Sequence, residues 1–197
     1  MDTPGDTSSG FSMRKCFKVS MSASEGLGKV HVITGPGKGK TTAAFGLAMR
    51  AAGHGLKVCV IQFMKTGETT GEVMAAKGVR GIEVQQFGTG KFVDLRKPSA
   101  EDRRLAREAL QYARAKLESG DCQMVVLDEV STAVSYGLIS KSDVLEAMKS
   151  RREGVEVVLT GRDAPLEIIE YADYVSVIDS WKHPFDEGVS ARKGIEW

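Results

Sequence analysis

Two lysines and three glycines stand close together between Gly35 and Lys40, and two threonines follow directly. Glycines let a loop turn tightly and bring backbone N–H groups close to an anion. The amine of Lys40 can neutralise phosphate oxygens, and the hydroxyl of Thr41 can bind Mg²⁺. The segment therefore predicts a loop that binds nucleotide phosphates through Gly35, Pro36, Gly37, Lys38, Gly39, Lys40, Thr41 and Thr42.

The spacing departs at one position from the usual pattern G-x-x-x-x-G-K-[ST]. Thr34 stands where the first glycine is expected, and Gly35 follows one place late. A glycine-rich turn without a ligand is the alternative interpretation. However, the apolar run at residues 30–33 predicts a strand and the Ala- and Leu-rich run at 43–52 predicts a helix. This order of strand, loop and helix is the context that the phosphate motif requires.

Residues 123–129 (QMVVLDE) place two acids at the end of an apolar run. In P-loop proteins such a strand ends beside the phosphate loop and supplies a carboxylate for Mg²⁺, directly or through water. Many buried strands end in an acid, so this pattern is informative only together with the glycine loop. The two together predict a metal site formed by Thr41, Asp128 and Glu129.

Polar residues mark the ends of two further predicted strands. Gln62 and Lys65 stand at and just beyond the end of the strand at 57–63, and Arg162 follows the strand at 155–160. In open α/β sheets, ligands bind at the carboxyl ends of the strands. We therefore expect Gln62, Lys65 and Arg162 to contact the nucleotide or its triphosphate.

Apolar runs alternate with helical patterns along the whole chain. Strands are predicted at 30–33, 57–63, 82–86, 123–129, 155–160 and 174–178, and helices at 43–52, within 67–77, and at 99–119, 140–149 and 163–171. Ser99 and Asp102 have the spacing of a capping box, and so do Ser140 and Asp143. Leu105, Ala109, Tyr112, Ala113 and Leu117 are the expected core positions of the long helix. Strands with both faces buried predict an α/β fold of the P-loop NTPase class, a mainly parallel sheet flanked by helices.

Composition limits the possible classes of protein. The 197 residues fit one domain at 28–197 after a Ser- and Gly-rich tail at 1–27, which is expected to be mobile. A net charge of +1 gives no general attraction to nucleic acid or to a membrane, and no apolar run is long enough for a membrane span. Three widely spaced cysteines are expected to be reduced, buried thiols of a cytoplasmic protein.

Two segments carry polar and aromatic residues outside the regular pattern. Residues 87–97 are glycine-rich and basic and are expected to form an active-site loop. Residues 180–197 contain two tryptophans, a phenylalanine and a histidine. This C-terminal strap is expected either to pack over a sheet edge or to form a wall of the site, and both interpretations stay open.

Several stretches together resemble the P-loop type of ATP:corrinoid adenosyltransferase. They are TGPGKGKTTAAFG at 34–46, RAAGHG at 50–55, VIQFMK at 60–65, VVLDE at 125–129, TGR at 160–162, WKHPFDEGV at 181–189 and KGIEW at 193–197. The resemblance thus covers all of the chain except its N-terminal tail. It implies a RecA-like fold, a homodimer, and ATP bound with its triphosphate reversed relative to ordinary P-loop hydrolases.

The activity that the resemblance implies is transfer of the 5′-deoxyadenosyl group of ATP to the cobalt of a reduced corrinoid. The corrinoid would be cob(I)alamin or cob(I)yrinic acid a,c-diamide, the product triphosphate, and the pathway adenosylcobalamin biosynthesis or salvage. Cob(I) is itself a strong nucleophile, so the protein must align the ribose carbon with cobalt and stabilise the leaving triphosphate. Lys40, Thr41 and Glu129 are the expected catalytic residues, with Glu129 the first choice for Mg²⁺. An electron donor, expected to be a flavoprotein, would supply cob(I).

The resemblance also implies apolar side chains that displace the lower axial ligand of cobalt. Many members have a Gly-Phe-Thr-Trp stretch for this task, whereas here residues 90–93 read Gly-Lys-Phe-Val, so one aromatic is shifted and the tryptophan is absent. The residues expected to bind the corrinoid are Phe87, Phe92, Val93, Trp181, His183 and Phe185.

Two other functions are compatible with the phosphate loop. A P-loop ATPase or kinase would act on the terminal phosphate and yield orthophosphate or a phosphorylated acceptor. A non-catalytic, ATP-dependent corrinoid carrier would bind both ligands without turnover. The products distinguish them, because only adenosyl transfer releases triphosphate.

Overall fold

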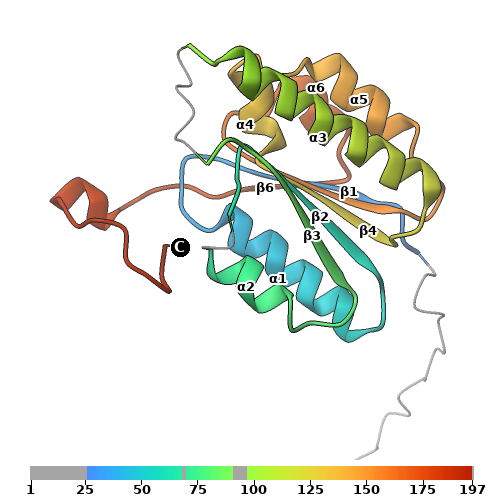
Figure 1. Ribbon diagram of the computed structural model, residues 1–197, viewed down its shortest axis with the longest axis horizontal. Helices are drawn as coiled ribbons and strands as arrows, with labels where there is room; N and C mark the ends of the chain where they lie inside the picture. The colour runs from blue at the N-terminus through green and yellow to red at the C-terminus, as the bar shows by residue number, and fades with distance from the viewer. Residues whose placement is uncertain (1–25, 68–69, 91–96, 197) are drawn as a thin grey trace, which may run out of the picture.

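The computed structural model describes residues 26–67, 70–90 and 97–196, and their strands form one parallel sheet (Figure 1). The strands are β1 (Val30–Thr34), β2 (Val58–Phe63), β3 (Ile82–Phe87), β4 (Met124–Asp128), β5 (Glu156–Thr160) and β6 (Tyr174–Val177). The helices are α1 (Lys40–Gly53), α2 (Gly71–Ala76), α3 (Ala100–Ser119), α4 (Val130–Ser135), α5 (Lys141–Lys149) and α6 (Leu166–Tyr171), with a 3₁₀ helix η1 (Pro184–Glu187). The sheet order is β3-β2-β4-β5-β1-β6 and every pairing is parallel, so the predicted fold class is confirmed.

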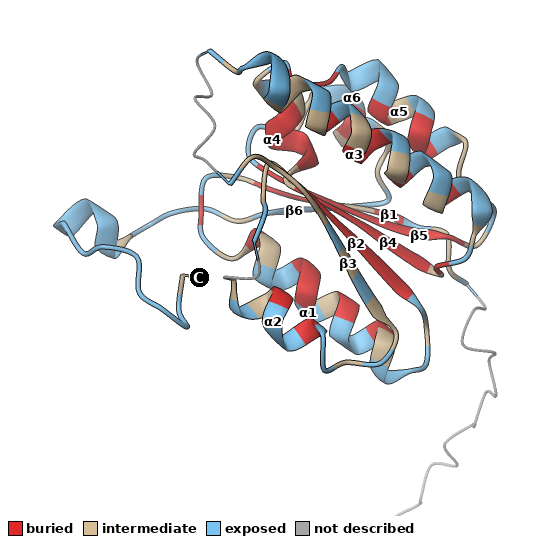
Figure 2. Ribbon diagram, in the orientation of Figure 1, coloured by how far each residue is buried: buried red, intermediate tan, exposed pale blue. Residues whose placement is uncertain are grey.

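Helices cover both faces of the sheet. α1 and α2 lie on one face and α3 to α6 on the other (Figure 1). Because successive side chains of a strand point to opposite faces, Leu127 of β4 joins the core under α3 and α5, while Val126 joins the core under α1. Figure 2 shows the resulting buried layer in the central strands. These strands are rigid supports for the side chains at their carboxyl ends.

The long helix α3 begins and packs as its sequence predicts, with one difference. Ser99 and Asp102 form the predicted capping box, each side chain bonding the backbone of the other residue. The buried positions are Ala106, Ala109, Leu110, Ala113 and Leu117. Leu105 and Tyr112 are only partly buried, because the apolar stripe is centred about one position further along the helix than predicted.

The expectation that every strand is buried on both faces is wrong for the two edge strands. β3 has no buried residue, and β6 is more exposed still. All four of its residues are exposed, including Tyr174 and Val177. Among the described strands β6 pairs only with β1, so it is an edge of the sheet. An apolar sequence therefore indicated the strand correctly but not its burial.

The expectation of reduced cysteines is also wrong for two of the three. Cys59 of β2 and Cys122, just before β4, form a disulfide across a sequence separation of 63 residues. β2 and β4 are neighbours in the sheet, and this places the two side chains together. The sequence could not show this pairing, because it depends on the order of the strands.

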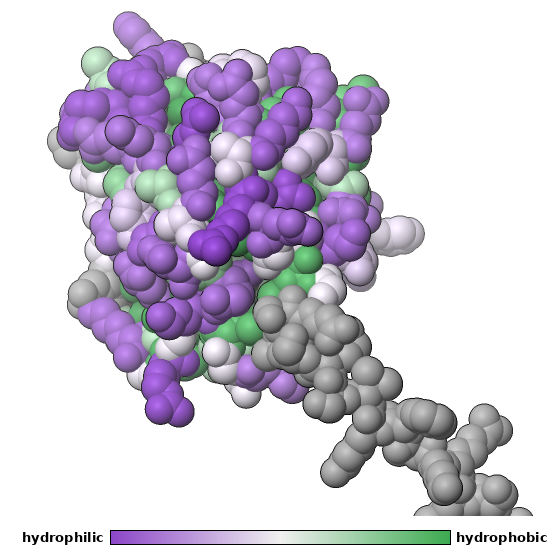
Figure 3. All heavy atoms as spheres, turned by 90° about the vertical axis from the view of Figure 1, so that its right-hand side faces the viewer, coloured by the Kyte–Doolittle hydropathy of each residue, from purple (hydrophilic) through white to green (hydrophobic). Residues whose placement is uncertain are grey.

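The surface at the amino ends of the strands lies opposite the carboxyl edge described next. Figure 3 shows this side as mostly hydrophilic, with apolar side chains only in small groups. Within the described part of the chain, no helix combines the length and apolar character needed to cross a membrane.

Candidate active site

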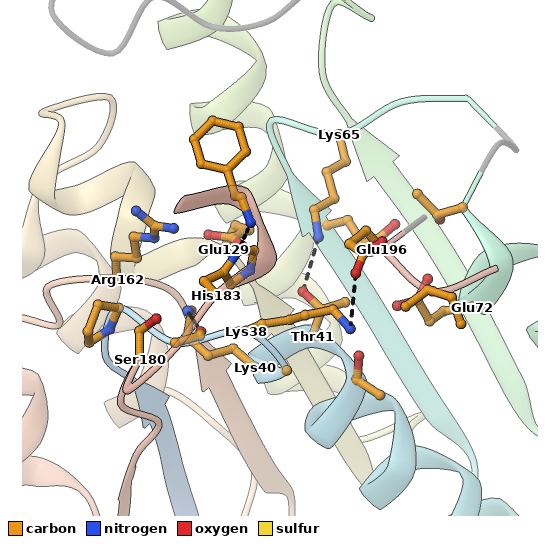
Figure 4. Close-up of a pocket in the computed structure, with 18 of the residues that line it drawn as sticks. Lys38, Lys40, Thr41, Lys65, Glu72, Glu129, Arg162, Ser180, His183 and Glu196 are labelled. Atoms are coloured by element: carbon orange, nitrogen blue, oxygen red, sulfur yellow. Dashed lines mark hydrogen bonds and ion pairs between the residues drawn. The ribbon is translucent and has the colours of Figure 1, made fainter. Parts of the chain in front are cut away.

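A pocket of about 730 Å³ lies at the carboxyl edge of the sheet (Figure 4). This volume is typical of cavities that hold a small molecule. Its lining comes from the glycine loop, three strand ends, the start of α2 and the C-terminal segment: Pro36, Gly37, Lys38, Gly39, Lys40, Thr41, Thr42, Gln62, Lys65, Thr70, Glu72, Glu129, Arg162, Ser180, His183, Phe185, Asp186, Ile195 and Glu196. Most of the predicted nucleotide-binding residues therefore share one cavity.

The glycine loop is packed against the backbone that follows β6. The Gly37 N–H donates to the carbonyl oxygen of Ile178 at 2.8 Å. A Cβ added at Gly37 would lie 2.3 Å from the Asp179 carbonyl oxygen, and one at Gly35 would lie 2.5 Å from that of Ile178. Only glycine fits such close approaches, and Gly35 also has a positive φ of 105°. The shifted glycine spacing thus has a physical reason in the loop's contact with the end of the sheet.

Lys40 is the first residue of α1 and is buried in the loop. Its Nζ donates to the carbonyl oxygens of Gly35 at 2.8 Å and Gly37 at 2.6 Å. Burial lowers the pKa of Lys40 below the ordinary lysine value, and the positive charge of Arg162 lowers it further against the opposing charge of Glu129. The Lys40 amine thus lies close to the N-terminus of α1, where the helix dipole favours the binding of an anion.

Asp128 lies behind the pocket, fully buried at the end of β4, and each of its oxygens accepts two hydrogen bonds. Oδ1 accepts from Thr41 at 2.9 Å and from Thr160 at 2.7 Å. Oδ2 accepts from Gln62 at 2.9 Å and from Lys65 at 2.8 Å. Burial opposes its ionisation, but the charge of Lys65 and these hydrogen bonds hold the pKa of Asp128 below its ordinary value. Asp128 therefore organises the ends of three strands and the loop.

Glu129 is held differently and faces the pocket. Its backbone has a positive φ of 66°, and its N–H donates to Thr160 Oγ1 at 2.9 Å. Its carboxylate accepts from the Thr132 hydroxyl at 2.6 Å, and the same hydroxyl accepts from the Arg162 N–H at 2.9 Å. One threonine thus ties the acid after β4 to the arginine after β5, two residues that the sequence placed at the site separately.

The predicted Mg²⁺ ligands fit the ion unequally. A carboxylate has about four acceptor positions, and those of Asp128 are filled by the four donors. Glu129 keeps acceptor capacity toward the pocket. Within residues 26–67, 70–90 and 97–196, no group of three or more His, Cys, Asp and Glu side chains could hold a metal. Of the two predicted carboxylates, Glu129 is thus the one with room for an ion, and Mg²⁺ commonly takes its other oxygens from water and phosphate.

The C-terminal segment forms a wall of the pocket, so of its two interpretations the structure supports this one. Glu196 lies 3.8 Å from Lys38 of the loop, and both are drawn in Figure 4. Hydrogen bonds from the side chain and backbone of Arg192 lower the pKa of Glu196 to about 2. Chain folding thus brings residues 195 and 196 back to the loop that follows β1.

A model of the family described as "ATP:corrinoid adenosyltransferase BtuR/CobO/CobP" matches residues 26–197. The chain belongs to this family. A corrinoid adenosyltransferase of Escherichia coli K12 is 41% identical over 170 residues, which are 86% of each chain. The corrinoid adenosyltransferase CobA of Salmonella typhimurium LT2 is 38% identical over 175 residues (89% of this chain, 88% of the relative), and a corrinoid adenosyltransferase of Pseudomonas aeruginosa is 36% identical over 171 residues (86% and 84%). As a family member this chain is a transferase.

The pocket also has lining residues that the sequence analysis did not name as site residues. They are Thr70, Glu72, Ser180, Asp186, Ile195 and Glu196. The stretch KGIEW was part of the family resemblance, and that was a usable signal for Ile195 and Glu196. For Thr70 and Glu72 the sequence offered only a loop with acids near a strand end.

The residues expected to bind the corrinoid are only partly brought together. His183 and Phe185 line the pocket, whereas Trp181 is 92% exposed and lies outside its lining. Phe87 packs against the core under α3, with its ring centroid 5.7 Å from that of Tyr112. Phe92 and Val93 lie outside the described residues. Gly35 also lies outside the lining, although its carbonyl oxygen binds Lys40.

Proposed function

We propose that the protein transfers the 5′-deoxyadenosyl group of ATP to the cobalt of a reduced corrinoid and releases triphosphate. The family match over residues 26–197 supports the reaction class. The observation that supports the proposal for this chain is a pocket lined by the glycine loop and by four cationic side chains, those of Lys38, Lys40, Lys65 and Arg162. Four cationic side chains and a helix N-terminus suit a leaving group made of three phosphates.

Lys40 and the loop amides would bind the triphosphate, and the Lys40 amine is buried and already oriented by its bonds to two loop carbonyls before a ligand arrives. Preorganised donors stabilise developing charge better than groups that must reorient. Arg162 would approach the same anion from the end of β5, where its backbone is fixed to Thr132. The attacking atom is supplied by the corrinoid, so the protein has to align the ribose carbon rather than activate a side chain.

Mg²⁺ would be held by Glu129 and Thr41 together with phosphate oxygens, with Asp128 as their support. When bound, the ion would neutralise negative charge on the leaving triphosphate. Glu129 reaches the pocket and has free acceptor capacity, whereas Asp128 already accepts four hydrogen bonds. The carboxylate of Asp128 would instead fix the orientation of the Thr41 hydroxyl.

The corrinoid would bind at the side of the pocket formed by the C-terminal segment. His183 and Phe185 offer a polar and an apolar surface there, and we keep Phe87, Phe92, Val93 and Trp181 as further candidates.

We also propose, from the family resemblance, a homodimer, a flavoprotein as electron donor, and action in the cytoplasm where ATP is available. The division of the chain into a tail at 1–27 and a domain at 28–197 stays a prediction.

The deciding experiment follows the products. The protein is incubated with ATP, Mg²⁺ and chemically reduced corrinoid, and loss of the cob(I) spectrum is recorded while phosphate products are separated by ion exchange. Triphosphate formed in equal amount to the alkylated corrinoid is expected. Orthophosphate with unchanged cob(I) would instead indicate an ATPase, a phosphorylated acceptor a kinase, and binding of both ligands without products a carrier.

A further inference from the structure

Lys65 stands between two groups that a P-loop protein commonly uses at its metal. Its Nζ lies 2.8 Å from Asp128 Oδ2 and 3.1 Å from Thr41 Oγ1. Figure 4 shows the side chain reaching down from the end of β2 toward the loop. A Thr of the loop and the acid at the end of the apolar strand are the usual protein ligands or supports of Mg²⁺ in this fold class. Here a side-chain cation bridges them.

The backbone around Lys65 is shaped to aim this side chain. Met64, directly before it, has a positive φ of 59°, which is uncommon for a residue with a Cβ. The backbone of Gly88, after β3, packs so closely that an added Cβ would lie 2.7 Å from the backbone nitrogen of Lys65. A strained residue and a required glycine together place Lys65, so its position is built into the fold rather than chosen by a free side chain.

The partners of Lys65 are themselves held from a further strand. Gln62 donates to the same Asp128 oxygen at 2.9 Å, and Gln86 of β3 donates to Gln62 Oε1 at 2.8 Å. Two of the three N–H donors of the Lys65 ammonium are thus engaged, one with Asp128 and one with Thr41.

We propose that Lys65 is a positioning residue, a tethered cation that occupies the space between Thr41 and Asp128 and excludes divalent metal until a nucleotide arrives. The inference rests on the proposed binding of ATP with Mg²⁺ in this pocket. A divalent ion close to the ammonium would be repelled, and it would find the Asp128 oxygens already filled. Phosphate oxygens would give Lys65 a new anionic partner and bring the metal with them. Metal and nucleotide would thus bind together and not in sequence.

The test measures Mn²⁺ binding without nucleotide or corrinoid, from the electron paramagnetic resonance signal of free Mn²⁺. The wild type is expected to bind no Mn²⁺ up to about 1 mM. Lys65→Met should bind Mn²⁺ with at least about tenfold higher affinity than the wild type, because a repelling charge is gone and Asp128 is exposed to the ion. Lys65→Arg should exclude Mn²⁺ like the wild type. The matched control is Lys38→Met, which removes one positive charge from the same pocket but none from Asp128, and it should gain little.

Two results would overturn the proposal. One is tight Mn²⁺ binding by the wild type without nucleotide, a measurement that needs no variant to fold. The other is an equal gain in Lys65→Met and Lys38→Met, which would assign the effect to the general charge of the pocket. If Lys65→Met is unfolded by circular dichroism, Lys65→Gln replaces it, since an amide can still donate to Asp128. The product assay is independent, so triphosphate release together with either result would refute this inference and leave the function intact.

Discussion

The ammonium of Lys40 lies 2.6 Å from the carbonyl oxygen of Gly37, inside the loop to which both residues belong. A second bond, to Gly35, fixes the same group at 2.8 Å. The lysine thus holds the loop in the shape that would receive phosphates. ATP would then meet donors and charge that need little rearrangement, which is the condition for effective stabilisation of a leaving group.

Lys40→Ala should lower the rate of adenosyl transfer by at least about 100-fold, because one preorganised cation is lost from the triphosphate pocket. The rate is measured as loss of the cob(I) spectrum at saturating ATP and Mg²⁺. Lys57→Ala is the control, since Lys57 is exposed just before β2, at the other end of that strand from the pocket. A near-normal rate in Lys40→Ala would refute the role given to this amine.

Gly37→Ala should lower turnover on the order of 100-fold, because the added Cβ would meet the Asp179 carbonyl oxygen at 2.3 Å and displace the loop. Gly46→Ala provides a matched control in the following helix. Gly46 has no atom within 4 Å of an added Cβ, so alanine there should leave turnover unchanged and stabilise the helix by roughly 0.5–1 kcal/mol. Steady-state kinetics and thermal unfolding of both variants check the pair. Normal kinetics in Gly37→Ala would show that the close approach is not required.

Glu156→Gln should destabilise the protein at neutral pH but not in acid. Burial opposes ionisation of Glu156, yet hydrogen bonds from His31 and from the N–H groups of Lys29 and Gly28 hold its pKa below the ordinary 4.5. A lowered folded-state pKa means that the carboxylate stabilises the fold above pH 4.5 and that this contribution is lost as the pH falls through the folded-state value.

The free energy of unfolding of Glu156→Gln, from urea titrations, should therefore lie about 1–3 kcal/mol below that of the wild type near neutral pH. The difference should shrink steadily below pH 4.5. Glu153→Gln changes an exposed acid three residues away and should show no such pH dependence. A constant difference at all pH values would contradict the assigned cause.

The disulfide between Cys59 and Cys122 should be detectable by alkylation and mass spectrometry. Denatured protein should take up two more alkyl groups after reduction than before it. Reduction should also lower the free energy of unfolding by up to about 4 kcal/mol, because the bond closes a loop of 63 residues. Equal alkylation with and without reductant, in protein isolated under air, would show that the bond does not form.

Local sequence patterns predicted the elements and most of the residues that share the pocket at the carboxyl edge. Glycine spacing, the apolar run before Asp128 and the polar strand ends each act through a few neighbouring residues, and parallel strands then bring them to one edge. The pairing of Cys59 with Cys122 and the exposure of β6 depend instead on the order of strands in the sheet, which no local pattern contains.

Side-chain direction was the other limit of the prediction. Phe87, one of the predicted corrinoid-binding residues, packs its ring beside Tyr112 of α3 and does not line the pocket, so the direction of its side chain could not be read from its place after a strand. Asp128 and Glu129 are adjacent and chemically alike, yet one is buried under four donors and the other faces the pocket. The left-handed backbone at Glu129 makes this difference, and a sequence of L residues gives no sign of it.

The left-handed backbone of Glu129 also implies that thermal stability and catalysis have opposite requirements at this position. Glycine or asparagine would adopt a φ of 66° more readily than glutamate, so either replacement should relieve conformational strain while removing the carboxylate from the pocket. Selection for heat resistance alone would then favour inactive molecules at this position. A screen that retains only thermostable variants is expected to accumulate such replacements, and a parallel screen for activity should eliminate them.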